Sequence, residues 1–120
     1  MTAERCLFIS CRDPGQDDRA QELLDSLLVC ASFGLPVAVL FQGDGLWQLL
    51  PGQHADALGR RSLSAQLESL PLFDVDDRYV LAEDLAHCGL QVDDLGLPCQ
   101  VLPASALPAL ISGCRHVLRG

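Results

Sequence analysis

The chain has 120 residues, 49% of them hydrophobic, and its 8 basic residues against 16 acidic ones give a formal net charge of −8. A chain of this length fits one domain over residues 1–120, with a core that needs no metal or disulfide support. All the basic residues are arginine, which excludes Schiff-base chemistry and phosphate loops that require lysine. The acidic balance argues against direct binding of nucleic acid or of an anionic membrane.

The first half of the chain predicts a strand, a helix and a second strand. The apolar run at residues 6–11 predicts a strand covered on both faces, and it is too short for a signal peptide or a membrane span. Apolar residues then recur at helical spacing over residues 20–31, which predicts a helix ending by Gly34. The β-forming run Val37–Phe41 predicts the second strand, so these elements form a right-handed βαβ unit.

The second half continues the alternation of helices and strands. Its predicted elements are two helical pieces over residues 46–70 broken at Pro51-Gly52, a strand at 78–81, a helix from Glu83 to Gly89, a strand around 99–102, a helix within 105–111 and a strand at 115–118. This order predicts a Rossmann-like three-layer α/β fold with a mostly parallel sheet of about five strands.

The segments after the strands are the candidate ligand sites, because parallel sheets bind ligands at the carboxyl ends of their strands. The segment after the first strand lacks G-x-G-x-x-G, which argues against a dinucleotide. After the second strand, Asp44 is either a metal or general-base carboxylate or part of a simple Gly-Asp-Gly turn. A third alternative is a small anion bound by backbone donors near Gly15 or Gly43. Trp47 and its leucine neighbours form either a subunit contact or part of the core.

The six cysteines are too few for a disulfide-built secreted scaffold, so we expect free thiols and a cytoplasmic protein. Neither C-x-x-C nor H-x-x-x-H occurs, and we expect neither a metal nor a cofactor. Cys6 and Cys11 fall on opposite faces of the first strand, and both are expected to be buried, as is Cys30 in the helix. Cys88, beside His87 near a helix end, is either inert or partly exposed and reactive.

The sequence resembles the TusC/DsrF family of small sulfur-relay proteins over nearly its whole length, and TusC more than DsrF. The resemblance rests on the block DGLWQLLPGQ at residues 44–53, on LFDV at 72–75 and on the stretch 81–89. It implies a DsrE-like fold and a heterohexamer containing two copies each of this chain and two related small subunits. Those partners are TusB-like and TusD-like, or DsrH-like and DsrE-like. A TusC role implies sulfur transfer toward 2-thiouridine at the tRNA wobble position, and a DsrF role implies sulfur oxidation.

The resemblance also implies where a sulfur-carrying cysteine belongs: at the end of the third strand, eight residues before the glycine that ends the next helix. Counting back from Gly89 gives Leu81, which cannot form a persulfide. We therefore expect a non-catalytic subunit rather than an enzyme in its own right. Its expected interface residues are Asp44, Gly45, Trp47, Gln48, Leu49, Leu50 and Pro51. The alternative is an independent thiol sulfurtransferase that uses Cys88 or Cys11 as its sulfur carrier.

Overall fold

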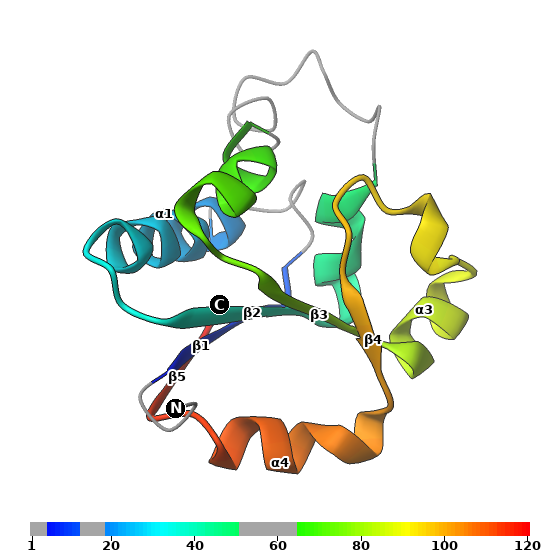
Figure 1. Ribbon diagram of the computed structural model, residues 1–120. Coiled ribbons are helices and arrows are strands. Elements are labelled where there is room, and N and C mark those ends of the chain that lie inside the picture. Colours follow the sequence, from blue (N-terminus) through cyan, green and yellow to red (C-terminus); the bar gives the residue numbers. More distant parts are fainter. Residues whose placement is uncertain (1–4, 13–18, 51–64) are drawn as a thin grey trace.

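Five parallel strands form the centre of the computed structural model, which describes residues 5–12, 19–50 and 65–120. They are β1 (Cys6–Ser10), β2 (Val37–Phe41), β3 (Asp77–Leu81), β4 (Gln100–Leu102) and β5 (His116–Arg119). In the described chain their order is β4-β3-β2-β1-β5, with every neighbouring pair parallel (Figure 1). The α/β fold with a parallel sheet is confirmed, and each predicted strand is correct to within one residue at either end.

The connections between strands explain this order. Helix α1 (Arg19–Ser32) leads from β1 to the adjacent β2, as the predicted βαβ unit requires. Helix α3 (Ala82–Cys88) and the 3-10 turn η4 (Val92–Asp94) then lead from β3 to β4. The turn η5 (Ala104–Ala106) and helix α4 (Leu107–Ser112) return the chain across the sheet to β5, beside β1 (Figure 1). The sheet order therefore reverses between β1 and β5.

Two apolar layers lie against the two faces of the sheet, because successive strand residues point to opposite sides. On β1, Phe8 belongs to the cluster under α1, whereas Leu7 and Ile9 belong to the cluster on the other face. The second face is covered by α4, none of whose residues is fully buried. Helix α4 therefore shields its face of the sheet less completely than α1, which buries three side chains.

The region 46–70, predicted as two helical pieces, is partly 3-10 helix in the structure. The described part begins with a 3-10 helix, η2 (Gly43–Leu49), and resumes as an α-helix at 65–69 that continues into η3 (Leu70–Phe73). The predicted break at Pro51-Gly52 lies outside the described residues. Gly34 and Gly89 end their helices as expected, with left-handed φ of 79° and 71°. No helix in the described ranges is long and apolar enough to span a membrane.

Candidate functional site

The segment η2 packs directly onto the end of β1. The Gln42 amide donates to the Ser10 carbonyl at 3.0 Å, and the Gly45 amide donates to the Gln42 carbonyl at 3.0 Å. A Cβ atom added at Gly45 would lie only 2.0 Å from the Ser10 carbonyl oxygen. The close approach of two backbones therefore requires glycine at this position.

Gln48 fixes the same contact through its side chain. Its Nε2 donates to Ser10 Oγ at 2.6 Å and to the Arg12 carbonyl at 3.1 Å, and both Gln48 and Ser10 are buried. A buried amide with two acceptors is well satisfied and holds the chain after β1 against η2. Leu46 and Leu49 of the same segment belong to the core.

The residues predicted as an interface thus divide into two groups. Gly45, Gln48 and Leu49 are buried within this chain, whereas Asp44 is exposed and Trp47 and Leu50 are half-buried. Pro51 lies outside the described residues. A surface contact can use only the second group, and the buried group serves the fold.

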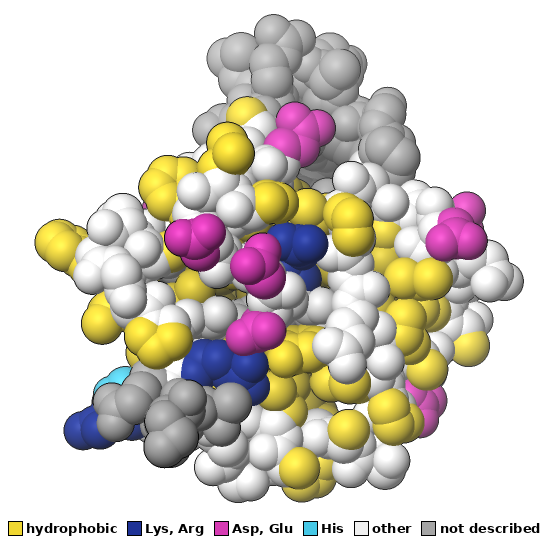
Figure 2. All heavy atoms as spheres, viewed as in Figure 1, with side chains coloured by type: hydrophobic (Ala, Val, Ile, Leu, Met, Phe, Trp, Pro, Cys, Tyr) yellow, Lys and Arg dark blue, Asp and Glu magenta, His cyan; other side chains and the backbone are white. Residues whose placement is uncertain are grey.

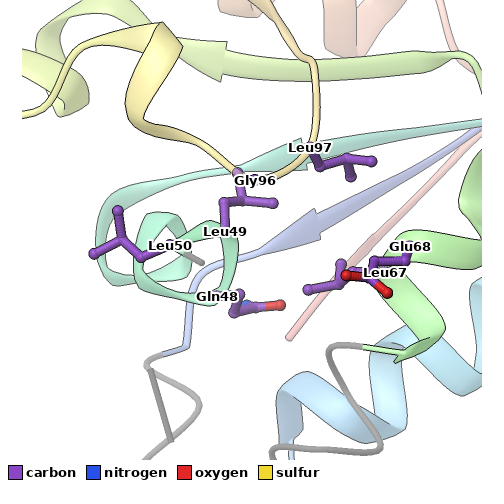
Figure 3. A pocket seen from close by; sticks show the side chains of 7 residues that line it. All are labelled: Gln48, Leu49, Leu50, Leu67, Glu68, Gly96 and Leu97. Atoms are coloured by element: carbon purple, nitrogen blue, oxygen red, sulfur yellow. The ribbon is translucent and has the colours of Figure 1, made fainter. Parts of the chain in front are cut away.

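A small pocket lies between η2, the helix at 65–69 and the loop before β4 (Figure 3). Its volume is about 90 Å³, and the Gly96 amide closes one side by donating to the Leu49 carbonyl at 2.6 Å. Pockets for drug-sized molecules occupy roughly 300–1,000 Å³. This one is too small for such a ligand. Its lining residues are Gln48, Leu49, Leu50, Leu67, Glu68, Gly96 and Leu97.

The carboxyl end of β2 already contains an internal carboxylate. Asp84 of α3 accepts a hydrogen bond from the Gly43 amide at 3.0 Å. The backbone donor that the sequence offered to a small anion at Gly43 is therefore taken, and Gly15, the other predicted donor, lies outside the described residues. No group of three potential metal ligands occurs within the described ranges.

Leu81 is the last residue of β3, immediately before α3. Its side chain is 4% exposed and packs in the apolar cluster beneath the sheet with Ile9 and Leu40. The helix that follows ends at Gly89. Leu81 at the end of β3 and Gly89 at the end of α3 therefore lie where the sequence predicts them, eight residues apart. The end of β3 therefore presents a buried hydrocarbon and no thiol.

All six cysteines are free thiols, and each is partly buried, so the prediction of full burial for Cys6, Cys11 and Cys30 was wrong. The opposite orientation of Cys6 and Cys11 is confirmed, because each packs against a different core cluster. These three cysteines are only partly buried because they lie at the ends of elements, where fewer residues cover them. Cys6 starts β1, Cys11 follows the last residue of β1, and Cys30 lies near the end of α1.

Neither candidate sulfur carrier has an activated thiol. Burial, and then the carboxylates of Asp84 and Asp44, raise the pKa of Cys88. Burial also raises the pKa of Cys11, although Arg119 and Arg12 oppose that rise. Because the thiolate is the nucleophile, a raised pKa lowers the reactivity of both cysteines near neutral pH.

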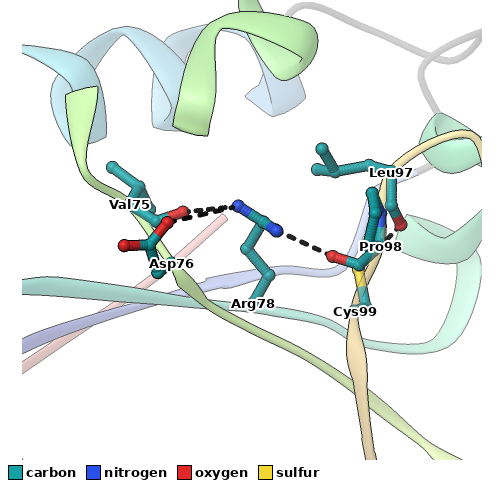
Figure 4. Close-up of polar contacts among 6 residues, drawn as sticks. All are labelled: Val75, Asp76, Arg78, Leu97, Pro98 and Cys99. Carbon is teal, nitrogen blue, oxygen red and sulfur yellow. Dashed lines mark hydrogen bonds and ion pairs between the residues drawn. The ribbon is translucent and has the colours of Figure 1, made fainter. Parts of the chain in front are cut away.

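Arg78 is a structural residue that the sequence did not single out. Its Nε donates to the Pro98 carbonyl at 2.8 Å and its Nη1 to the Val75 carbonyl at 2.9 Å (Figure 4). The guanidinium thus joins the start of β3 to the segment before β4. An arginine next to an acidic run is the only sequence signal for this contact, and that signal does not identify carbonyl partners.

Residues 4–119 match the DsrE/DsrF-like family. The chain belongs to this family. The "Protein TusC homolog" of Pseudomonas aeruginosa is 42% identical over 116 residues, which cover 97% of this chain and 98% of that relative. "Protein TusC" of Escherichia coli is 32% identical over 117 residues, again covering 97% and 98%. The chain is thus a TusC-like member of the family.

A solved structure of the YchN protein from E. coli has the same fold. It is 12% identical to this chain and superposes with a TM-score of 0.79, covering 98% of this chain and 99% of that one. At this identity the likeness concerns the fold alone. It agrees with the five-stranded parallel sheet described above.

Proposed function

We propose that this protein is a non-catalytic subunit of a cytoplasmic, heterohexameric sulfur-relay complex. Two copies each of this chain, a TusB-like chain and a TusD-like chain form the complex, which passes persulfide sulfur toward 2-thiouridine at the tRNA wobble position. The identity of 42% and 32% to proteins named TusC, over nearly the whole chain, supports the TusC form of the family.

Leu81 is the observation that carries the non-catalytic part of the proposal. The family resemblance puts the sulfur carrier at the end of β3, and this chain has a buried leucine there. A hydrocarbon side chain neither ionises nor forms a persulfide. The remaining role for the carboxyl edge of the sheet is to contact and shape a neighbouring subunit that holds the carrier.

Exposed apolar side chains support the role of a subunit. Hydrophobic groups gather over the turn that follows α1, at the left of Figure 2. In that region Phe33 is 79% exposed, and in η3 Leu72 is 83% exposed. Exposed apolar surface of this kind is typical of proteins that bind other chains.

The cysteines provide the first test. In a reconstituted complex of the three chains, the variants Cys88→Ser and Cys11→Ser are expected to transfer sulfur at the unsubstituted rate, because neither thiol carries it. The rate of sulfur transfer is measured as the appearance of 2-thiouridine in tRNA. If Cys88→Ser leaves assembly intact but abolishes transfer, the chain is itself a carrier, and the independent sulfurtransferase becomes the better account.

Trp47 provides the second test, at the predicted interface after β2. Trp47→Ala is expected to weaken assembly by about 2 kcal/mol or more, since buried tryptophans are frequent hot spots. The comparison variant is Leu72→Ala, which tests the exposed apolar surface of η3 separately, because η3 precedes β3 and lies at the opposite ends of the strands. Affinities are measured by titrating labelled variant into the two partner chains. Loss of binding with Leu72→Ala alone would place the interface at the amino edge and contradict the assignment of Trp47.

A further inference from the structure

Two cysteines from different elements come together where β1 starts and α1 ends. Cys6 is the first residue of β1, and Cys30 lies in the last turn of α1. Both side chains pack against the same apolar cluster, which lies between α1 and the sheet. Helix α1 ends above the side of the sheet where β1 and β2 start (Figure 1). The two thiols therefore lie in the same layer and at the same end of the strands.

Backbone hydrogen bonds hold these two positions together. The Cys6 amide donates to the Pro36 carbonyl at 3.0 Å, and the Leu35 amide donates to the Cys30 carbonyl at 3.2 Å. The register of the sheet agrees, because Cys6 pairs with Val37, the residue after Pro36. The dipeptide Leu35-Pro36 thus bridges the backbones of the two cysteines.

The spacing along the helix and along the strand keeps the two thiols at the same level. Phe8 of β1 and Leu27 of α1 are both 1% exposed in the cluster between these elements. Because α1 runs antiparallel to β1 in the βαβ unit, Cys30 lies about 4.5 Å closer to the strand starts than Leu27 does. Cys6 lies about 6.6 Å from Phe8 in the same direction and on the same face of β1. These steps are similar in length, so the two thiols lie near each other.

The two thiols also interact electrostatically. Burial raises the pKa of Cys6, and the thiols of Cys30 and Cys114 raise it further, while Arg115 opposes the rise. Such effects reach about 10 Å at ordinary ionic strength. Cys114 lies on the other face of the sheet, because it packs against the second apolar cluster. Of these two neighbouring thiols, Cys30 is therefore the one that shares a face with Cys6.

The helix can adjust its backbone at Cys30. The Phe33 amide is shared between the Val29 and Cys30 carbonyls, at 3.3 and 3.2 Å. Shared hydrogen bonds are typical of helix ends, which open more readily than the middle of a helix. A disulfide needs its two Cβ atoms about 3.5–4.5 Å apart. The last turn of α1 is the part of the helix best suited to such a movement.

We propose that Cys6 and Cys30 form a modification site, a dithiol that low-molecular-weight disulfides such as oxidised glutathione convert to a reversible intrachain disulfide. The bond ties the end of α1 to the start of β1. The site is independent of the relay function, because it consists only of this chain's residues and needs no partner.

The reaction is two successive thiol–disulfide exchanges. One cysteine thiolate attacks the oxidant, which forms a mixed disulfide and releases one glutathione thiolate. The second cysteine thiolate then attacks the sulfur of the modified cysteine and releases the other glutathione thiolate. Each released thiolate takes up a proton lost by a cysteine. Two cysteine thiols are thus oxidised, and one glutathione disulfide is reduced to two thiols.

Oxidation of the purified full-length chain tests the pair. The protein is incubated with oxidised glutathione at pH about 8.5, where more of each thiol is ionised, and is then alkylated and digested with trypsin. Because trypsin cleaves after arginine, Cys6 and Cys11 share the peptide 6–12, whereas Cys30 lies in the peptide 20–60. Mass spectrometry detects the linked peptides, and their fragments distinguish Cys6 from Cys11. The same oxidation in concentrated guanidinium chloride gives the unfolded reference.

The fold and the unfolded chain favour different disulfides. In denaturant, the shorter loop makes the Cys6–Cys11 bond more frequent than the Cys6–Cys30 bond by about tenfold. In the folded chain the preference is expected to reverse, because Cys6 and Cys11 pack against opposite faces of the sheet. The Cys6–Cys30 bond should then be the main disulfide of Cys6.

Serine variants identify the second thiol. Cys30→Ser is expected to leave Cys6 with a lasting glutathione adduct, which the unsubstituted chain resolves. Cys99→Ser is the matched control, since Cys99 is also partly buried against the same cluster, and it should keep the Cys6–Cys30 bond. A thermal melt confirms that each variant is folded. A lasting adduct on Cys6 of the unsubstituted folded chain, a bond from Cys6 to Cys11 or Cys114 as its main disulfide, or no reaction overturns the proposal.

Discussion

Gly45 is the glycine that tolerates a side chain least among those in the described ranges. Alanine at this position would bring its Cβ to 2.0 Å from the Ser10 carbonyl oxygen, and both neighbours of the contact are backbone. We expect Gly45→Ala to lower the free energy of unfolding by about 3 kcal/mol, because η2 must move away from β1. Chemical denaturation measures the change.

Gly43→Ala is the matched control, two residues earlier in the same segment. Gly43 has a left-handed φ of 56° but no atom within 4 Å of an added Cβ. Its substitution carries only the backbone strain of about 1 kcal/mol. If Gly43→Ala is as destabilising as Gly45→Ala, the steric contact with Ser10 is not what fixes η2.

We expect the Cys99 thiol to make the free energy of unfolding depend on pH in the alkaline range. Burial raises its pKa from 9.0 to about 11, although Arg78 opposes the rise. Between these two values the unfolded chain loses the thiol proton while the folded chain keeps it, so the free energy of unfolding falls as the pH rises. The contribution of the Cys99 thiol to the free energy of unfolding is fully present below pH 9.0 and is lost as the pH rises toward 11.

Cys99→Ala removes this contribution and leaves the other thiols in place. Denaturation curves across that pH window are expected to show a shallower loss of stability in the variant than in the unsubstituted protein. An identical slope in the two proteins would mean that Cys99 titrates equally in the folded and unfolded chains.

Residue roles were the least predictable part of the sequence. The sequence predicts an interface at Asp44, Gly45 and residues 47–51, where Trp47 lies with leucines beside a turn. Within the chain, the Gln48 side chain binds Ser10 and Arg12, which lie 38 and 36 residues earlier. A sequence pattern shows that a side chain is polar, but it does not show which distant acceptor it reaches.

At the scale of elements, Arg78 joins two consecutive strands at their starts. Its Nε and Nη1 each donate to a carbonyl, of Pro98 and Val75 respectively (Figure 4). Arg78→Lys is expected to lower the free energy of unfolding by about 1–2 kcal/mol, because one ammonium group cannot satisfy two carbonyls on opposite sides. Chemical denaturation again gives the value.

Asp76→Asn separates this explanation from a simple ion pair. Asp76 Oδ1 lies 3.9 Å from Arg78 Nη1, and its side chain is 76% exposed. Exposed pairs contribute little, so this variant should be nearly neutral. A loss as large as that of Arg78→Lys would assign the effect to the charge pair instead of the carbonyl contacts.

The regular elements were predictable because their signals are local. Buried strands such as Val37–Phe41 are continuous apolar runs, and α1 has helical spacing that ends at Gly34. The 3-10 geometry of η2 and η4 was not predicted, since helices of three to seven residues show too little periodicity. The cavity beyond the ends of β1 and β5 was not predicted either, because Arg12 and Arg119, which line it, come together only through the pairing of these two strands.

At the scale of the whole molecule, the two ends of the parallel strands carry different features. The carboxyl ends are followed by η2 and by the cavity beyond β1 and β5, and Leu81 ends β3, whereas the exposed Leu72 and Phe33 lie in segments that precede strands. A chain with exposed apolar surface and no thiol at the end of β3 is suited to hold neighbouring subunits and leave the sulfur to one of them. The central claim is therefore about assembly and about which chain carries sulfur.

Native mass spectrometry of the tagged protein, purified gently from its own cells, tests this claim most directly. The account predicts a complex containing two copies of this chain and two copies each of two other small chains, with any added sulfur mass on a partner. A monomer or homo-oligomer that carries the added sulfur on one of its own six cysteines would contradict it.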